Sequence, residues 1–320
     1  MIRGILIAVL LLLSLGTRST PAADRAIWAW EQDSSAMVQE RAAGDAAIAF
    51  LKSKRIGILY LYADAFQGQT LLETQPQLYR EFIRRLHGKG LRVYALLGSA
   101  YLHTEAYILP EHRAVALAMF RRVLDFNAAA RPGERFDGIN LDIEPHILDQ
   151  WAQQKMQLLG QFLDLGQAFM ELKRTSGQSL PVGPAIPFWL DGIVLDWHGT
   201  AKPVSEQVID LYDYVALMDY RDHADGPDGI VSLGADEMEY ANRRHKKVVI
   251  GVDFSPGEIQ KTSFAHLAEA DLERELALAE RAYHGSPAFA GFALHHFGAY
   301  QRWLERKPRT AGAGTDAALP

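Results

Sequence analysis

Residues 139–144, with the sequence INLDIE, alternate strictly between aliphatic and polar side chains. Side chains on a strand point to opposite faces in turn, so Asn140, Asp142 and Glu144 share one face. Two carboxylates about 7 Å apart repel each other where water is scarce, and the repulsion raises the pKa of one of them. A carboxyl group that keeps its proton near neutral pH can act as a general acid. The pattern therefore predicts acid–base chemistry, the alternative being a buried polar ladder that backbone groups satisfy.

Further polar side chains recur where the other strand-like stretches end. They are Glu31, Asp64, Ser99, Tyr220, Asp222, Asp253, His295 and His296. The beginnings of the same stretches are apolar. Because the carboxyl ends of parallel strands meet at one edge of a sheet, these residues predict a single functional site there.

The elements that must position this site alternate along the chain. Strand-like runs cover 26–31, 57–64, 92–98, 138–144, 181–188, 214–222, 247–253 and 290–297. Helix-like runs cover 36–54, 77–89, 111–130, 148–175, 204–211, 236–245 and 268–283, with a short eighth at 300–306. Several strands are almost continuously hydrophobic, which is typical of parallel strands covered by helices. Eight such units predict an α/β fold, a single (β/α)8 TIM barrel, rather than an open doubly wound sheet.

The two ends of the chain differ from this pattern. In residues 1–23, Arg3 precedes an apolar run and small residues follow, as in a secretory signal peptide. The run is shorter than the roughly 20 apolar residues of a spanning helix. We expect a secreted or periplasmic protein without stable membrane insertion after cleavage, an uncleaved anchor being the alternative. The catalytic barrel should then cover 24–306, and 307–320 should be a disordered C-terminal tail.

Composition excludes several classes of protein. The chain of 320 residues has no cysteine, which excludes disulfide scaffolds, thiolate metal sites and cysteine nucleophiles. Its 33 basic and 39 acidic residues give a net charge of −6, which argues against nucleic acid as a partner. No H-x-H or H-E-x-x-H spacing occurs, so we expect neither a metal nor another cofactor.

The run from Asp137 to Glu144 resembles the strand-four signature D-G-x-D-x-D-x-E of glycoside hydrolase family 18, the chitinase-like TIM barrels. The run from Met218 to Asp222 is similar to that family's M-x-Y-D stretch. The resemblance implies a glycoside hydrolase in which Glu144 is the general acid/base. It also implies that Asp142 steers a substrate acetamido group onto the anomeric carbon and that Tyr220 hydrogen-bonds that group.

The chain departs from the family pattern at two points. Arg221 stands where the family has an aspartate directly after the tyrosine, and acid returns only at Asp222. On the last strand, His295 and His296 occupy the place of an aromatic residue. The remaining candidates for substrate binding are Asn140, Trp30, Met218, Asp222, Asp253, His296, Trp189 and Glu31. Of these, Trp30 and Trp189 are expected to stack on sugar rings, whose C–H faces are apolar.

The expected substrate is a polysaccharide or oligosaccharide, with amino-sugar polymers tried first. Two alternatives remain open at this point. Glu144, followed by Pro145, could pair with Asp253 as nucleophile in a retaining glycosidase. The chain could also be a non-catalytic carbohydrate-binding barrel, to which Arg221 would contribute by pairing with Glu144.

The apolar run and its small-residue exit predict that the mature protein begins near Ala23 or Asp24. N-terminal sequencing of the protein recovered outside the cytoplasm should find that start. Met1 retained in a membrane fraction would contradict the prediction.

Overall fold

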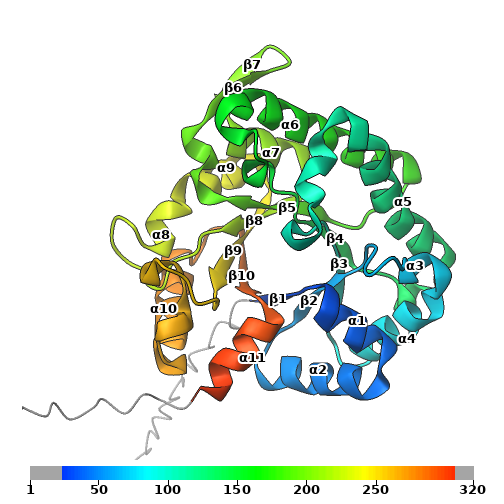
Figure 1. Cartoon of the computed structure of the whole chain (residues 1–320). Coiled ribbons are helices and arrows are strands. Elements are labelled where there is room, and N and C mark those ends of the chain that lie inside the picture. The colour runs from blue at the N-terminus through cyan, green and yellow to red at the C-terminus, as the bar shows by residue number, and fades with distance from the viewer. Residues whose placement is uncertain (1–23, 307–320) are drawn as a thin grey trace, which may run out of the picture.

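A computed structural model describes residues 24–306, and eight parallel strands form a closed barrel within it (Figure 1). The strands are β1 (Arg25–Ala29), β2 (Ile58–Tyr62), β3 (Arg92–Leu97), β4 (Gly138–Leu141), β5 (Val182–Pro187), β8 (Tyr214–Met218), β9 (Lys247–Asp253) and β10 (Phe289–His295). Each strand pairs with its predecessor and successor, and β10 pairs with β1 to close the barrel. The predicted single (β/α)8 barrel is confirmed, and the open sheet is excluded.

Helices surround the barrel on its outer side (Figure 1). They are α1 (Glu31–Gln39), α2 (Arg41–Ser53), α3 (Leu71–Thr74), α4 (Pro76–His87), α5 (Arg113–Ala129), α6 (Trp151–Ser176), α7 (Val204–Leu211), α8 (Ile230–Leu233), α9 (Ala235–Arg244), α10 (Glu269–Ala282) and α11 (Phe297–Glu305). No helix among residues 24–306 is long and apolar enough to cross a membrane. The predicted signal peptide (1–23) and C-terminal tail (307–320) lie outside the described residues.

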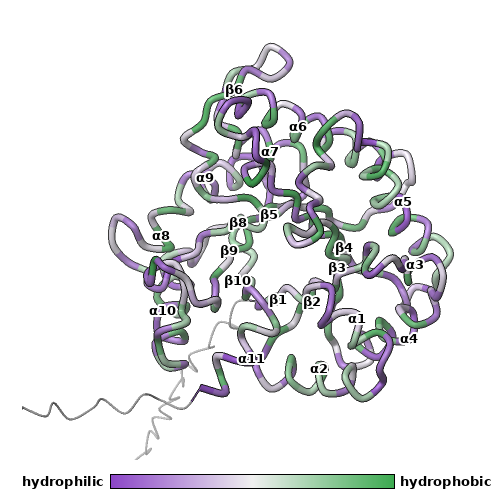
Figure 2. Tube along the Cα trace, viewed as in Figure 1, coloured by the Kyte–Doolittle hydropathy of each residue, from purple (hydrophilic) through white to green (hydrophobic). Residues whose placement is uncertain are grey.

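The strands are buried on both faces, which explains their hydrophobic sequences. Every residue of β2 is buried: Leu59 and Leu61 pack under the helices, and Tyr60 and Tyr62 point into the barrel. Figure 2 shows apolar stretches along β4 and β5 near the centre of the molecule. The rings of Trp28 and Tyr60 meet inside the barrel with centroids 5.3 Å apart. The interior below the carboxyl ends is therefore a packed aromatic core, and only the end of the barrel is left for a site.

The observed elements differ from the predicted ones within the first helix, in the segment after β5 and at the ends of two strands. The expected helix 36–54 is two helices, because the backbone at Glu40 is extended. A hairpin of β6 (Val194–Trp197) and β7 (Thr200–Pro203) follows β5 and was not predicted. β4 ends at Leu141 and β8 at Met218, earlier than the expected 144 and 222. The alternation of side chains continues past Leu141 as far as Glu144, but beyond Met218 it no longer holds at Asp222.

Candidate active site

A cavity of about 350 Å³ lies at the carboxyl ends of the strands. Its lining consists of Trp28, Trp30, Glu31, Ser99, Ala100, Tyr101, Asp142, Glu144, Ala185, Met218, Tyr220 and His295. Half of these residues are the predicted site residues Trp30, Glu31, Asp142, Glu144, Met218 and Tyr220. Residues from six of the eight barrel strands and the loops after them thus converge on one space.

Asp142 and Glu144 follow β4 and enter the cavity together. The chain directly after β3 passes against the backbone of Asp142: Gly98 adopts φ +94°, and a Cβ there would lie 2.3 Å from the carbonyl oxygen of Asp142. Burial, then the neighbouring charges of Glu144 and Glu31, raise the pKa of Asp142 well above its ordinary value. Burial also raises the pKa of Glu144. The pair therefore favours holding a proton, as a general acid requires.

Glu144 has neighbours that the sequence analysis did not single out. His146 Nε2 lies 3.4 Å from Glu144 Oε2, and burial lowers the pKa of that imidazole. The ring of Trp189 packs edge-on against His146 with centroids 5.3 Å apart. The charge of Glu105, a buried carboxylate in the loop after β3, adds to the rise in the pKa of Glu144. Trp189 thus packs on His146, the neighbour of Glu144, and does not line the main cavity.

Tyr220 lies over the cavity because β9 makes room for its ring. A Cβ at Gly251 would lie 2.8 Å from the carbonyl oxygen of Leu217 and 3.3 Å from Cε1 of Tyr220. The ring also stacks on His295, with centroids 5.5 Å apart. Burial, with the charge of Asp142 as the next cause, raises the pKa of Tyr220 well above its usual range. The phenol therefore keeps its proton and can donate a hydrogen bond.

His295 is a cavity residue that the sequence analysis passed over in favour of its neighbour. Its Nδ1 lies 2.7 Å from Oδ1 of Asp253, and Trp30 Nε1 donates to its Nε2 at 3.4 Å. Asp253 also accepts from the backbone N–H and the hydroxyl of Ser255, at 2.8 and 3.0 Å. Asp253 therefore lies behind His295 and orients the imidazole, and it does not line the cavity.

His296 is at the N-terminal end of α11, outside the cavity lining. Burial lowers the pKa of its imidazole to about 4, and its Nδ1 is buried without a hydrogen-bond partner. Ala293 belongs to the barrel interior, so the alternation along β10 brings His295 inward. The cavity is therefore lined by His295 and not by His296, the histidine predicted from the sequence. The alternation of side chains along β10 is the feature of the sequence that indicates His295.

Asn140 lies beneath the cavity and not in its lining. It is fully buried, its Oδ1 accepts from Trp28 Nε1 at 2.8 Å, and its Nδ2 donates to the carbonyl oxygen of Gly183 at 3.3 Å and to the Tyr214 hydroxyl at 3.2 Å. Asn140 is therefore a buried polar residue whose side chain is hydrogen-bonded within the barrel, as in the polar-ladder alternative, and it forms the floor of the site.

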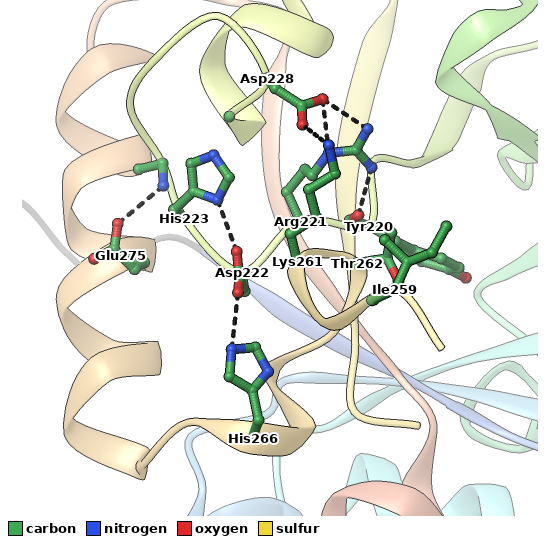
Figure 3. A network of polar contacts seen from close by, with 12 residues as sticks. Tyr220, Arg221, Asp222, His223, Asp228, Ile259, Lys261, Thr262, His266 and Glu275 are labelled. Carbon is green, nitrogen blue, oxygen red and sulfur yellow. Dashed lines mark hydrogen bonds and ion pairs between the residues drawn. The ribbon is translucent and has the colours of Figure 1, made fainter. Parts of the chain in front are cut away.

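Arg221 and Asp222 belong to a polar network between the loops after β8 and β9 (Figure 3). Arg221 donates to Oδ1 of Asp228 from Nε at 3.0 Å and from Nη2 at 2.8 Å, and its Nη1 donates to the carbonyl oxygen of Tyr220 at 2.8 Å. Asp222 lies 2.7 Å from His223 Nδ1 and 3.1 Å from His266 Nε2. Asp222 thus ties the loops together and is not in the cavity lining, because β8 ends four residues before it. Arg221 pairs with Asp228 and leaves Glu144 accessible.

Residues 24–306 contain no group of three or more histidine or acidic side chains arranged to hold a metal ion.

Comparisons with known proteins agree with the architecture. No protein-family model and no curated protein sequence matches the chain. Among solved structures, a family 18 N-acetylglucosaminidase from Paenibacillus barengoltzii gives a TM-score of 0.52 at 13% identity, over 88% of this chain and 97% of that one. A class V chitinase from Nicotiana tobaccum gives 0.51 at 12% identity, over 88% and 96%.

A family 18 chitinase variant from Cycas revoluta, solved in complex with (GlcNAc)4, gives a TM-score of 0.50 at 13% identity over 88% of this chain and 97% of that one. At such identities the similarity concerns the fold. It confirms that this chain resembles the glycoside hydrolase family 18 barrels over 88% of its length.

The charges around Glu144 predict opposite effects of two substitutions on the pKa of its carboxyl group. Glu105→Gln removes a nearby negative charge and should lower that pKa, whereas His295→Gln removes the electrostatic effect that lowers it and should raise it. Titration of ¹³C-labelled glutamate carboxyl resonances, with Glu144→Gln for assignment, measures both shifts. Shifts in the same direction, or none, would show that these neighbours do not set the proton affinity of Glu144.

Proposed function

We propose that this protein is a glycoside hydrolase in which Glu144 is the general acid/base. The observation that carries the proposal is the convergence of Asp142 and Glu144, both with raised pKa, in one cavity at the carboxyl end of the barrel. A glycosidic oxygen leaves readily only when it receives a proton as its bond to the anomeric carbon breaks. A protonated Glu144 can supply that proton.

The second requirement is a nucleophile, and a substrate acetamido group meets it best. Its carbonyl oxygen would attack the anomeric carbon while Asp142 accepts a hydrogen bond from its N–H and Tyr220 donates one to its oxygen. The Glu144 carboxylate left by the first step would then take a proton from the water that opens the cyclic intermediate. Amino-sugar polymers such as chitin are therefore the proposed substrates. The chitinases of similar fold support this choice, one of them solved in complex with (GlcNAc)4.

The aromatic lining supports a carbohydrate ligand. Trp28 and Trp30 stand on the β1 side, Tyr101 on the β3 side, and Tyr220 follows β8. Tyr101 is 76% exposed, unusually so for a ring of its size, and it lies at the cavity. Such rings pack on the apolar C–H faces of sugars. With the signal peptide expected over residues 1–23, we propose that the protein meets its polysaccharide outside the cytoplasm.

Two alternatives are less well supported. Asp253 as nucleophile would have to leave its bonds to Ser255 and His295, and it lies outside the cavity lining. A non-catalytic barrel would be favoured by an Arg221–Glu144 pair, but the partner of Arg221 is Asp228.

Glu144→Gln should abolish hydrolysis of chitin oligosaccharides while the thermal unfolding midpoint stays unchanged. Glutamine keeps the size of the side chain but cannot deliver a proton, and general acid catalysis contributes roughly 100- to 10,000-fold. Initial rates measured by product chromatography give the loss, with the exposed Glu111→Gln as matched control. Wild-type turnover in Glu144→Gln would remove Glu144 from this role.

The nucleophile should be identified by three further variants. If the acetamido group attacks, Asp142→Asn and Tyr220→Phe should each reduce kcat severely, and Asp253→Asn should reduce it less than either. Only substrates with an acetamido group should then be cleaved. If instead Asp253→Asn is as damaging as Glu144→Gln and polymers without acetamido groups are cleaved, the enzyme uses Asp253 as its nucleophile.

A further inference from the structure

Glu31 is a buried carboxylate at the edge of the cavity with no partner for one of its oxygens. It begins α1 directly after Trp30, and only 7% of its surface is exposed. Its Oε1 is buried and accepts no hydrogen bond. A buried carboxylate oxygen without a donor is costly, so the position calls for a ligand that supplies one.

Glu31 also lines a second, smaller space of about 130 Å³, so it stands where the two spaces adjoin. The polar residues of this recess besides Glu31 are Ser35, Gln39, Asp64, Gln67 and Gln69. Its volume is less than half that of the main cavity, and its polar lining suits a substituent of a sugar better than an apolar group.

The charge of Glu31 is not balanced by a lysine or arginine of the two linings. In the part of the chain that the structure describes, neither lining contains a lysine or arginine. Arg122 pairs with Asp64, so its positive charge is already engaged there. The charge of Glu31 adds to the effects of burial and of Glu144 in raising the pKa of Asp142. A cation bound at Glu31 would relieve both the missing hydrogen bond and this repulsion.

We propose that Glu31 binds the ammonium group of a 2-amino-2-deoxy sugar, so that the preferred substrate is a partially deacetylated amino-sugar polymer. This inference rests on the proposed function only for the position of the sugar. In that reaction the acetamido group of the cleaved unit lies between Asp142 and Tyr220, so the ammonium group must belong to an adjoining unit. A neutral hydroxyl could donate to Glu31 as well, but it would leave the negative charge unbalanced.

Binding measured without hydrolysis separates this inference from the proposed reaction. Isothermal titration calorimetry of Glu144→Gln should compare short, partially acetylated chitosan oligosaccharides with the same preparation after complete N-acetylation. In the second ligand each ammonium group has become a neutral acetamido group, and the chain length is unchanged. We expect the first to bind roughly tenfold more tightly, as for a hydrogen bond to a charged group.

Adding Glu31→Gln to this background should abolish the preference, and adding the exposed Glu111→Gln should leave it intact. Equal affinity for the two preparations, or a preference that survives Glu31→Gln, would overturn the inference. The substrate comparison in Glu144→Gln alone decides the case if the double variant does not fold. Hydrolysis by the unmodified protein is scored separately: cleavage of neither preparation would overturn the proposed function, whatever the binding preference.

Discussion

Two neighbouring carboxyl groups, those of Asp142 and Glu144, are kept in a poorly solvated cavity whose lining offers them a single basic side chain, His295. Ionising both would place two negative charges side by side away from water, so a proton is retained. The barrel makes this possible by closing the space below. Asn140 seals the floor through Trp28 and Tyr214. The close passage of β3 holds the backbone of Asp142 from the side.

A second group of residues, centred on His295, counteracts the rise in the pKa of Glu144. His295 is held by Asp253 and covered by Tyr220, so one imidazole connects the strand-nine carboxylate to the phenol over the site. The electrostatic effect of His295 lowers the pKa of Glu144 against the effect of burial. Arg221 takes no part, since its guanidinium pairs with Asp228, which also pairs with Lys261 between the outer loops (Figure 3). The guanidinium of Arg221 is thereby engaged by Asp228 and does not pair with Glu144.

Most of the fold and the centre of the site could be predicted from the sequence, because both follow the periodicity of strands. Alternation along β4 brought Asp142 and Glu144 together. It failed for Asp222, because β8 ends at Met218 and the loop beyond follows its own hydrogen bonds. The same rule applied to β10 selects His295, which the analysis missed. Glu105 lies in a loop without periodicity, so only the folded chain shows that it is beside Glu144.

The most direct test of a catalytic Asp142–Glu144 pair is a crystal structure of Glu144→Gln with (GlcNAc)4 bound. We expect a glycosidic oxygen within hydrogen-bonding distance of the Gln side chain at position 144. We also expect the acetamido group of the sugar whose anomeric carbon carries that oxygen to lie between Asp142 and Tyr220. An oligosaccharide bound on another face of the barrel, or one in the cavity with its glycosidic oxygens out of reach of residue 144, would contradict this assignment.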